Sequence, residues 1–389
     1  MKKVIYVFCS QNFGGAEIVI RRLICFNKSK VFPVVFCPPG LFSDELKRNN
    51  IQVVETKSLG SLERGRRSFT KLFLPFLVLK KICLINVSLL KELFKGPLAV
   101  HTNNLPATIY VLPAMFLARW FIRKDIQWIW SSHDMSYPDN LSWKLAGYCV
   151  RQFHKTLVVS EAVKRLYPGG QSRITVLYNG IDTDLFRDDA ESRIAFRRKF
   201  ELPEKSTVVA IVGKISRGKG HLVLLEVFQK LFKLYSEAYL MIIGSFSTVE
   251  PDFENEIRSK IKEIAENRLI LVSPLEKIQQ AYNGIDVLVN CTSINLGESL
   301  GTTIYEAMSC KKLVVATKTG GTPEIVDDGV DGFLVSPDDA SDLAAKLSFV
   351  IENLPQLDEV REAARRKVIE KFNIQKMAEN YNRILGFSE

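Results

Sequence analysis

The sequence is short of the residues that build metal centres and disulfide frameworks. Its 389 residues include four histidines and seven cysteines. The cysteines are scattered, mostly inside apolar stretches, and none forms a close metal-ligand pair. An odd number of cysteines also argues against a disulfide framework. We therefore expect a chain that folds in a reducing compartment and needs no structural metal.

Long uninterrupted apolar runs are missing as well. Lysines interrupt the run from Phe69 to Leu84, and two prolines and an arginine interrupt the run from Leu105 to Ile122, so neither predicts a good membrane span. The apolar segment that follows Met1 is too short for a signal peptide. Internal repeats and low-complexity segments are absent too. The sequence therefore predicts a folded chain in the cytoplasm.

What the chain has is length, apolar content and an uneven distribution of charge. With 47% hydrophobic and 25% charged residues it is long enough for two domains with separate cores. The net charge is +10, and residues 1–186 hold 26 Lys and Arg against 12 Asp and Glu. Such a basic half suggests a polyanionic partner, and charge alone does not separate nucleic acid, an anionic membrane surface and a basic surface without a partner. The basic, aromatic-interleaved motif of a nucleic-acid module is absent, so we expect no nucleic acid. Arg64, Arg66 and Arg67, beside apolar residues, favour a helix at an anionic bilayer surface over a pure core helix.

Short β-branched runs alternate with longer amphipathic stretches along the whole chain. The predicted strands are Val4–Phe8, Val31–Cys37, Gln52–Glu55, Leu98–Thr102, Gln127–Ser132, Thr156–Val159, Ile174–Tyr178, Val208–Gly213, Tyr239–Ile243, Leu269–Ser273, Val287–Asn290, Leu313–Ala316 and Phe333–Val335. Strands that alternate with helices indicate βαβ units and parallel sheets. Two such series predict two Rossmann-like domains, joined by the turn-rich segment Asn179–Phe186.

Two glutamates eight positions apart are the most informative feature. A glycine-flanked turn and the start of a predicted helix lie between Glu298 and Glu306. Because eight positions are just over two helical turns, one carboxylate can contact a sugar ring while the other contacts a ribose. The first amides of a helix have no internal partner and can face a diphosphate. The spacing alone is common, and Glu306 as a solvated helix residue is the alternative.

The segments after this pair supply its context. In order, they are the helix Tyr305–Met308, the apolar strand Leu313–Ala316, the run Gly320-Gly321-Thr322-Pro323-Glu324, and then Asp328-Gly329 and Gly332-Phe333. This order resembles the C-terminal half of the retaining glycosyltransferases of family 4, which have the GT-B fold. The resemblance is specific between Asn290 and Leu343 and again near the C-terminus.

The resemblance implies an α/β fold in which two Rossmann-like βαβ domains face each other across a cleft. Residues 1–184 would bind the acceptor and residues 185–372 the nucleotide sugar. A C-terminal helix, at about residues 373–389, would cross back to the first domain. Asp182-Thr183-Asp184 is similar to a metal-binding motif, but it falls in the predicted hinge, away from any diphosphate, so no metal is expected.

Two glycine-containing loops follow the first strand of each predicted domain. Gly14 and Gly15 permit close backbone approach at a helix start, with a tight turn as the alternative reading. Lys214 and Lys219 are five positions apart and can both reach one diphosphate, with solvated loop lysines as the alternative. By the resemblance, all four face the donor phosphates. The family usually has arginine at the position of Lys214, so Arg217 is a second candidate for that role.

Three polar residues end predicted strands of the first domain. His133 follows an apolar strand, where a structural histidine is the alternative to a functional one. The resemblance places a histidine here beside the donor sugar. His101 and Asn103 end another strand, and we expect them on the acceptor side of the cleft.

The resemblance assigns the remaining roles within residues 298–306. Glu298 would contact the hydroxyls of the donor sugar and Glu306 those of the ribose. The amides of Leu300, Gly301 and Thr302 would face the phosphates. Leu300 stands where the family commonly has an aromatic, so the shape of the pocket differs from the usual pattern. We expect His133, Glu298 and Lys219 to be the catalytic residues.

Together these features predict a retaining glycosyltransferase that is metal-independent and uses a UDP- or GDP-sugar. A basic, apolar first domain favours a lipid-linked or cell-envelope glycan as acceptor, in polysaccharide biosynthesis. It also favours a peripheral position at the inner face of the plasma membrane. A soluble small-molecule acceptor is one alternative. A catalytically silent partner subunit that binds nucleotide sugar is another.

Overall fold

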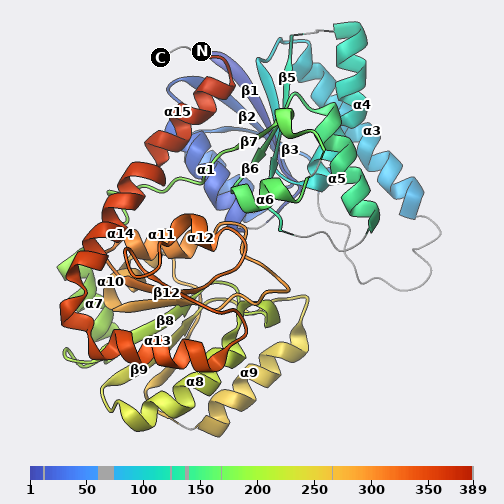
Figure 1. Cartoon of the computed structure of the whole chain (residues 1–389). Helices are drawn as coiled ribbons and strands as arrows, with labels where there is room; N and C mark the ends of the chain where they lie inside the picture. Colours follow the sequence, from blue (N-terminus) through green and yellow to red (C-terminus); the bar gives the residue numbers. More distant parts are fainter. Residues whose placement is uncertain are drawn as a thin grey trace. The chain divides into compact units, whose positions relative to one another are not determined.

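Two successive series of strands and helices divide the chain into two units in the computed structural model (Figure 1). Unit 1 comprises Met1–Gly180 and Ile374–Glu389, and unit 2 comprises Ile181–Asn373. The structure describes residues 1–11, 14–59, 74–122, 125–135, 140–167, 169–264 and 266–387. The first part of the apolar run predicted from Phe69 lies outside the described residues.

Unit 1 is built on a seven-stranded sheet in which every neighbouring pair is parallel. Its strands are β1 (Lys2–Val7), β2 (Val31–Cys37), β3 (Gln52–Glu55), β4 (Ala99–Thr102), β5 (Gln127–Ser132), β6 (Lys155–Val158) and β7 (Ile174–Val176). Their order is β3-β2-β1-β4-β5-β6-β7. Helices cover both faces of such a sheet, which is why central strands such as β1 read as continuous apolar runs.

The helices of unit 1 follow the strands in alternation. They are α1 (Gly15–Asn27), α2 (Leu41–Arg48), α3 (Leu74–Leu93), α4 (Leu105–Leu117), α5 (Asn140–Gln152), α6 (Glu161–Arg165) and α15 (Ile374–Ile384), with short η1 (Lys57–Leu59), η3 (Ala118–Ile122) and η4 (Gln171–Arg173). Figure 1 shows α3, α4 and α5 on one side of the sheet and α1 with α15 on the other. By length and composition, one stretch of the described helices, Leu105–Ile122, could cross a membrane; its mean hydropathy is 1.5 and 39% of it is buried. Core helices of folded domains meet the same criterion.

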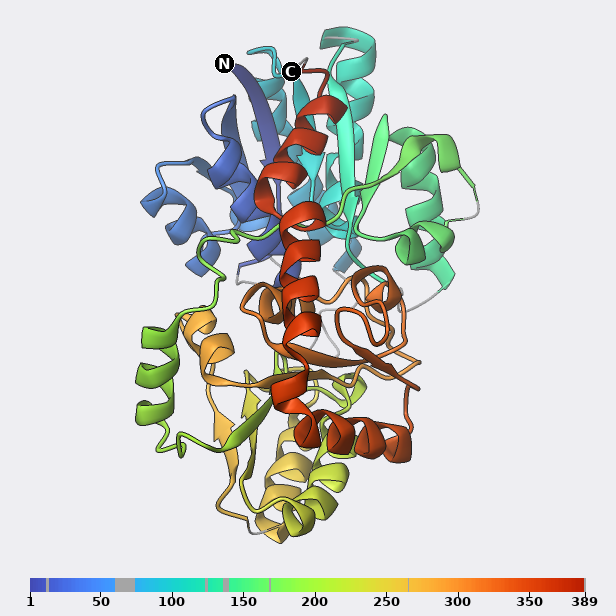
Figure 2. The same ribbon diagram turned by 60° about the vertical axis from the view of Figure 1, so that its left-hand side comes forward.

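The C-terminal helix α15 belongs to unit 1, although unit 2 precedes it in the chain (Figure 2). Its Met377 and Tyr381 lie in the same apolar core as β1 and α1. The side-chain amides of Asn27 and Asn382 exchange hydrogen bonds of 2.7 and 3.0 Å. Near the two chain ends, the Lys2 ammonium lies 5.0 Å from the centre of the Phe387 ring.

Unit 2 contains a six-stranded parallel sheet of order β10-β9-β8-β11-β12-β13. Its strands are β8 (Thr207–Val212), β9 (Ala238–Ile243), β10 (Leu269–Val272), β11 (Val287–Asn290), β12 (Leu313–Thr317) and β13 (Phe333–Val335). Its helices are α7 (Ala190–Lys199), α8 (His221–Leu234), α9 (Pro251–Ile264), α10 (Ile278–Gly284), α11 (Thr302–Ser309), α12 (Thr322–Ile325), α13 (Ala340–Glu352) and α14 (Asp358–Lys371), with short η5 (Arg217–Lys219) and η6 (Leu354–Gln356). Each predicted strand has a counterpart, so the predicted α/β class with two βαβ units is confirmed.

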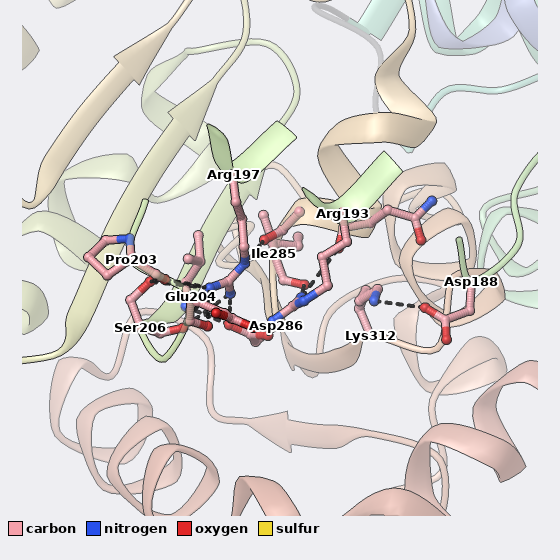
Figure 3. A network of polar contacts seen from close by, with 12 residues as sticks. Asp188, Arg193, Arg197, Pro203, Glu204, Ser206, Ile285, Asp286 and Lys312 are labelled. Carbon is pink, nitrogen blue, oxygen red and sulfur yellow. Dashed lines mark hydrogen bonds and ion pairs between the residues drawn. The ribbon is translucent and has the colours of Figure 1, made fainter. Parts of the chain in front are cut away.

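A buried ionic network fixes α7 to the sheet of unit 2 (Figure 3). The Asp286 carboxylate accepts hydrogen bonds from Arg193 Nη2 at 2.8 Å, Arg197 Nη2 at 2.7 Å and the Val208 amide at 2.8 Å. Arg197 is 5% exposed, and its remaining donors bond backbone carbonyls, including those of Gly284 and Ser206. Burial of a cation is tolerated here because every donor is paired. The network therefore holds α7 against the amino-terminal edge of the sheet, away from the carboxyl ends of the strands.

Candidate functional site

In unit 2, the loops after β8 and β11 bring a lysine and a glutamate together at the carboxyl ends of the strands. Lys219 ends the short helix η5 after β8, and Glu298 lies in the loop after β11. Lys219 Nζ lies 2.7 Å from Glu298 Oε2, an ion pair between residues 79 positions apart. Ligands of open α/β sheets bind at this edge. The two residues predicted to contact the donor therefore meet directly.

Two residues that the sequence analysis did not single out hold the Glu298 carboxylate. Thr292 Oγ1 lies 3.0 Å from Glu298 Oε2 and 3.0 Å from Asn290 Oδ1, so its single proton serves one oxygen at a time. The Asn290 amide is 3.4 Å from the same carboxylate oxygen. The sequence contains only a weak signal for these two residues. They are polar and lie at the end of the apolar strand Val287–Asn290 or just beyond it, where polar residues of a solvated turn are just as common as functional ones.

The Glu298 carboxylate is ionised although it is 9% exposed. Burial by itself would raise its pKa, but the Lys219 charge and the hydrogen bonds from Lys219, Thr292 and Asn290 outweigh burial, so the pKa lies below its usual value. A buried carboxylate and a half-buried ammonium thus form a nearly neutral pair. The ammonium can exchange the carboxylate for an anionic group of a substrate, and the carboxylate can exchange the ammonium for hydrogen-bond donors of a substrate.

Glycines allow the backbone of these loops to approach closely. Gly320 has a φ of +50°, and a Cβ at that position would lie 2.0 Å from the Glu298 carbonyl oxygen. The neighbouring Gly321 amide donates to that oxygen at 2.7 Å. Gly220, with a φ of +73°, would place a Cβ 2.1 Å from the Cys291 carbonyl oxygen. Only glycine fits both positions, which fixes the loops that carry Glu298 and Lys219.

Glu306 lies on α11, eight positions after Glu298, and is buried. It is 7% exposed, and its Oε2 accepts a hydrogen bond from Tyr282 Oη at 2.9 Å. The helix begins at Thr302, after Gly301 with a φ of +68°, so its first amides have no partner within the helix. The Leu300 side chain is 1% exposed and packs inside the unit, so only its backbone is available to a ligand.

The two other basic residues near this edge differ in what they contact. Arg217 makes an ion pair of 2.7 Å with Glu256 and stacks 5.0 Å above the Phe253 ring, both on α9. Lys214 is exposed and makes no ion pair with any described residue. The geometry therefore favours Lys214 over Arg217 as the second cation for a diphosphate.

In unit 1, His133 and Asn103 meet at the carboxyl ends of β5 and β4. His133 Nε2 lies 3.1 Å from Asn103 Oδ1. Burial lowers the pKa of His133 to about 4, so the imidazole is neutral at pH 7. Asn103 is 2% exposed and its Nδ2 has no hydrogen-bond partner among the described residues. A neutral imidazole beside an unsatisfied amide donor suits recognition of a hydroxyl oxygen.

His101 does not take the acceptor-facing position that the sequence suggested. It is 1% exposed, with Nδ1 2.9 Å from Tyr381 Oη and Nε2 2.7 Å from Ser131 Oγ. Burial, and to a smaller extent the neighbouring His133, lowers its pKa to about 3. Because both ring nitrogens are paired inside the core, His101 ties α15 to the sheet.

The glycines at the start of α1 also have a local partner. The Gly14 amide donates to Glu17 Oε2 at 3.0 Å, and Ser10 Oγ donates to Glu17 Oε1 at 2.6 Å. Glu17 is 7% exposed and supplies the glutamate half of a capping box, a contact readable from its place three positions after Gly14. The Gly14 amide, which we expected to face the donor phosphates, therefore already donates a hydrogen bond to the Glu17 carboxylate. A Cβ added at Gly15 would meet no described atom within 4 Å.

The structure thus gathers the predicted residues into two groups, one in each unit. Lys214, Lys219, Glu298, Glu306 and the start of α11 lie at one edge of unit 2. His133, Asn103 and the α1 loop lie at the carboxyl edge of unit 1. Among the described residues no group of three or more His, Cys, Asp or Glu could hold a metal ion. Asp182, in the linker, instead accepts the amides of Asp184 and Leu185, each at 3.0 Å.

Two family models match the chain, one over most of unit 1 and the other over most of unit 2. Residues 13–185 match the model described as Glycosyltransferase Family 4, and residues 192–367 match the model described as Glycosyl transferases group 1. The two models together span nearly all of both units.

The chain belongs to glycosyltransferase family 4.

Individual relatives match this chain at low sequence identity and over only part of its length. Trehalose synthase of Thermococcus litoralis is 24% identical over 281 residues, which span 68% of this chain and 66% of that protein. D-inositol 3-phosphate glycosyltransferase of Mycolicibacterium smegmatis is 32% identical over 205 residues, 51% of this chain and 45% of that protein. The match thus spans less than two thirds of either relative's length.

A solved structure of the same fold covers the whole chain. HepE of Anabaena, in complex with UDP and glucose, aligns with a TM-score of 0.84 at 21% identity, covering 99% of this chain and 100% of that chain. Two parallel βαβ units of this kind are the GT-B fold of family 4.

Proposed function

We propose that the protein transfers a sugar from a nucleoside diphosphate sugar to an acceptor hydroxyl, with retention of the anomeric configuration. The observation that carries the proposal is the Lys219–Glu298 pair at the carboxyl edge of unit 2, eight positions before the buried Glu306. The UDP and glucose named for HepE are consistent with such a donor. UDP- and GDP-sugars both fit the arrangement.

Charge exchange explains how the Lys219–Glu298 pair can bind a donor. When the diphosphate arrives, it replaces the Glu298 carboxylate as the partner of Lys219. The carboxylate, still held by Thr292 and Asn290, then accepts hydrogen bonds from the sugar hydroxyls. Glu306, whose Oε2 accepts a hydrogen bond from Tyr282, then meets the ribose hydroxyls. One donor molecule thus provides ionic or hydrogen-bond partners for Lys219, Glu298 and Glu306, which are buried or half-buried.

The same residues supply the chemistry of the departing diphosphate. As the bond from the anomeric carbon to the phosphate oxygen breaks, negative charge grows on the diphosphate, and Lys219, Lys214 and the start of α11 stabilise it. We propose no carboxylate nucleophile, because Glu298 serves the sugar hydroxyls. The acceptor hydroxyl then attacks the face that the diphosphate leaves, and a phosphate oxygen takes its proton. His133 and Asn103 would orient sugar hydroxyls.

We propose that cations of the chain replace a divalent metal in this role. Lys219 and Lys214 together offer two positive charges to the two charges of a diphosphate ester. Treatment with a strong chelator should therefore leave the turnover number unchanged. A loss of activity that Mg²⁺ restores would overturn this part of the proposal.

For the acceptor we propose a lipid-linked or cell-envelope glycan in polysaccharide biosynthesis, reached from the cytoplasmic face of the membrane. The excess of basic residues in unit 1 and its exposed apolar helices support this choice. The names of the two curated relatives point instead to small soluble acceptors for those proteins. A soluble acceptor is therefore the second candidate.

The deciding experiment measures release of nucleoside diphosphate from a panel of UDP- and GDP-sugars, with and without lipid extract. We expect release from one donor that rises with lipid, and a fall in the turnover number of roughly tenfold to a thousandfold in Lys219→Ala. Lys230→Ala, an exposed lysine on α8, is the matched control. Binding of nucleotide without release from any donor would instead indicate a catalytically silent subunit.

A further inference from the structure

Two neighbouring helices of unit 1 expose an unusual amount of apolar surface. On α3, Leu84 is 52%, Val87 55% and Phe94, just after the helix, 73% exposed. At the end of α4 and in η3, Leu117 is 43%, Trp120 80% and Phe121 79% exposed. We call these six residues the apolar face. Scattered apolar residues are normal on a protein surface, but several large ones on adjoining helices mark an interaction site.

The exposed residues of α3 lie on one stripe of the helix. Lys80, Leu84, Val87, Lys91 and Phe94 are exposed and recur every three or four positions, so they share a side. The opposite side, with Ile85, Leu89 and Leu93, is fully buried. A helix that packs on a sheet normally has polar residues on its outer side. Here the outer side is apolar and basic.

A buried amide joins α3 and α4 into one rigid support. Asn86 of α3 donates to the Tyr110 carbonyl at 2.8 Å and accepts from the Ala114 amide at 2.7 Å. These two backbone groups of α4 would otherwise bond each other, and Pro113 lies between them, so the Asn86 side chain is inserted into the helix ladder. The π-helical turn of η3 follows and exposes two successive aromatics, Trp120 and Phe121.

The charge around the apolar face has one sign. Residues 74–122 contain five Lys and Arg and a single acidic residue, Glu92. Glu92 is 8% exposed and is paired with Lys3 at 3.1 Å and Lys95 at 2.6 Å. Lys80 and Lys91 are exposed on the stripe itself and make no ion pair with a described residue. A partner of the apolar face therefore has to be apolar within and negative at its surface.

We propose that the apolar face docks unit 1 on an anionic lipid surface, with Trp120 and Phe121 inserted at the headgroup level. An anionic bilayer offers both required properties, because lysines are attracted to its negative surface and indole rings favour its interface. This inference deepens the proposed function, on which it rests, by naming the surface that brings the protein to a lipid-linked acceptor. Cys9 lies two residues after β1, and its thiol is near enough to Lys81, in the first half of α3, for the lysine charge to act on the thiol's pKa, so α3 begins toward the carboxyl edge of the sheet. The apolar face therefore runs along α3 and α4 from Leu84 to Trp120 and Phe121, which come shortly before β5 and so lie toward the amino-terminal edge of the sheet.

Tryptophan fluorescence tests the proposal directly in the full-length protein. Of the four tryptophans, Trp128 and Trp130 are fully buried and Trp143 is half-buried, so Trp120 dominates the solvent-exposed emission. Vesicles of phosphatidylcholine with phosphatidylglycerol should shift this emission to the blue and protect it from acrylamide. Phosphatidylcholine alone should have little effect, and Trp120→Phe should remove the signal while vesicle sedimentation still reports binding.

Variants then separate the apolar and the basic contributions. The double variant Trp120→Ser, Phe121→Ser should bind anionic vesicles at least about tenfold more weakly, because two inserted rings are lost. Lys80→Glu with Lys91→Glu should weaken binding to a similar extent and abolish the preference for anionic lipid. Leu234→Ser, at a residue of unit 2 that is 70% exposed, and Lys230→Glu on the same helix are the matched controls and should change neither. All replaced side chains are on the surface, so folding is preserved.

The result that overturns the proposal is the absence of vesicle binding, or binding that survives the Trp120, Phe121 double variant. Concentration-dependent self-association that this variant abolishes would assign the apolar face to a second copy of the chain instead. Nucleoside diphosphate release, measured without lipid, is an independent readout. Release without vesicle binding would reject only the docking surface, and vesicle binding without release would reject only the proposed transfer.

Discussion

At the scale of single residues, the site is organised by polar groups that act on one carboxylate. Glu298 is buried, yet Lys219, Thr292 and Asn290 keep its pKa low. Of these, Thr292 is fully buried and so has no role as a solvated side chain. Its function in this arrangement is to orient the carboxylate and to keep it ionised.

Thr292→Val should lower kcat/KM by roughly tenfold to a hundredfold, because a hydrogen bond to a buried charged group is lost. The acid limb of the pH profile should move to higher pH, since the pKa of Glu298 rises when the donor is removed. Thr292→Ser should restore both values. A profile whose shape is unchanged in Thr292→Val would assign the hydroxyl a purely structural role.

Glu306→Ala should raise the donor KM by roughly tenfold or more and change kcat little, because ribose contacts are the same in the ground state and the transition state. Steady-state kinetics with the preferred donor measure both parameters. Tyr282→Phe removes only the 2.9 Å hydrogen bond to Glu306 and should give a smaller rise in KM. An equal fall in kcat and kcat/KM would place Glu306 in the chemical step instead.

At the scale of elements, strands were predictable and loops were not. Runs such as Val31–Cys37 and Val287–Asn290 match β2 and β11 because parallel strands buried on both faces read as continuous apolar segments. The contacts between loops depend on residues far apart in the chain, such as Lys219 and Glu298, and no periodicity encodes them. His101 is a second example. The sequence does not distinguish a strand-end histidine that faces a cleft from one that, as here, pairs inside the core with Tyr381 of a distant helix.

Gly320→Ala should disable the site, whereas Gly329→Ala should not. Both glycines have a positive φ, of +50° and +75°, so both variants carry a similar backbone strain of about 1–2 kcal/mol. A Cβ at Gly329 meets nothing within 4 Å, but one at Gly320 would overlap the Glu298 carbonyl oxygen at 2.0 Å. The excess loss of activity and of melting temperature in Gly320→Ala therefore measures the close approach alone. Equal effects of the two variants would show that strain, not the approach, matters.

At the scale of the whole molecule, buried histidines make stability depend on pH. His101 has an ordinary pKa of 6.5 when unfolded and about 3 when folded, because burial disfavours its charged form. Between these values the unfolded chain binds one proton more than the native chain, so the free energy of unfolding decreases as the pH falls. His101 thus contributes stability that is complete above pH 6.5 and is lost toward pH 3.

His101→Gln should flatten this dependence by about 1.4 kcal/mol per pH unit within that window. Urea denaturation at several pH values measures the slope separately from the absolute stability, which the variant also lowers because two hydrogen bonds change. His133, with a pKa lowered to about 4, leaves a residual slope. An unchanged slope would mean that His101 is protonated in the native state.

The return of α15 to unit 1 has a consequence for how the protein is made. During synthesis, residues 181–373 leave the ribosome before Ile374–Ile384, whose Met377 and Tyr381 complete the core of unit 1. Domains generally fold as units as soon as their sequence is available. We therefore expect unit 2, second along the chain, to be the first to fold completely. Unit 1 has to wait, with the α1 side of its sheet uncovered, until translation reaches its last helix.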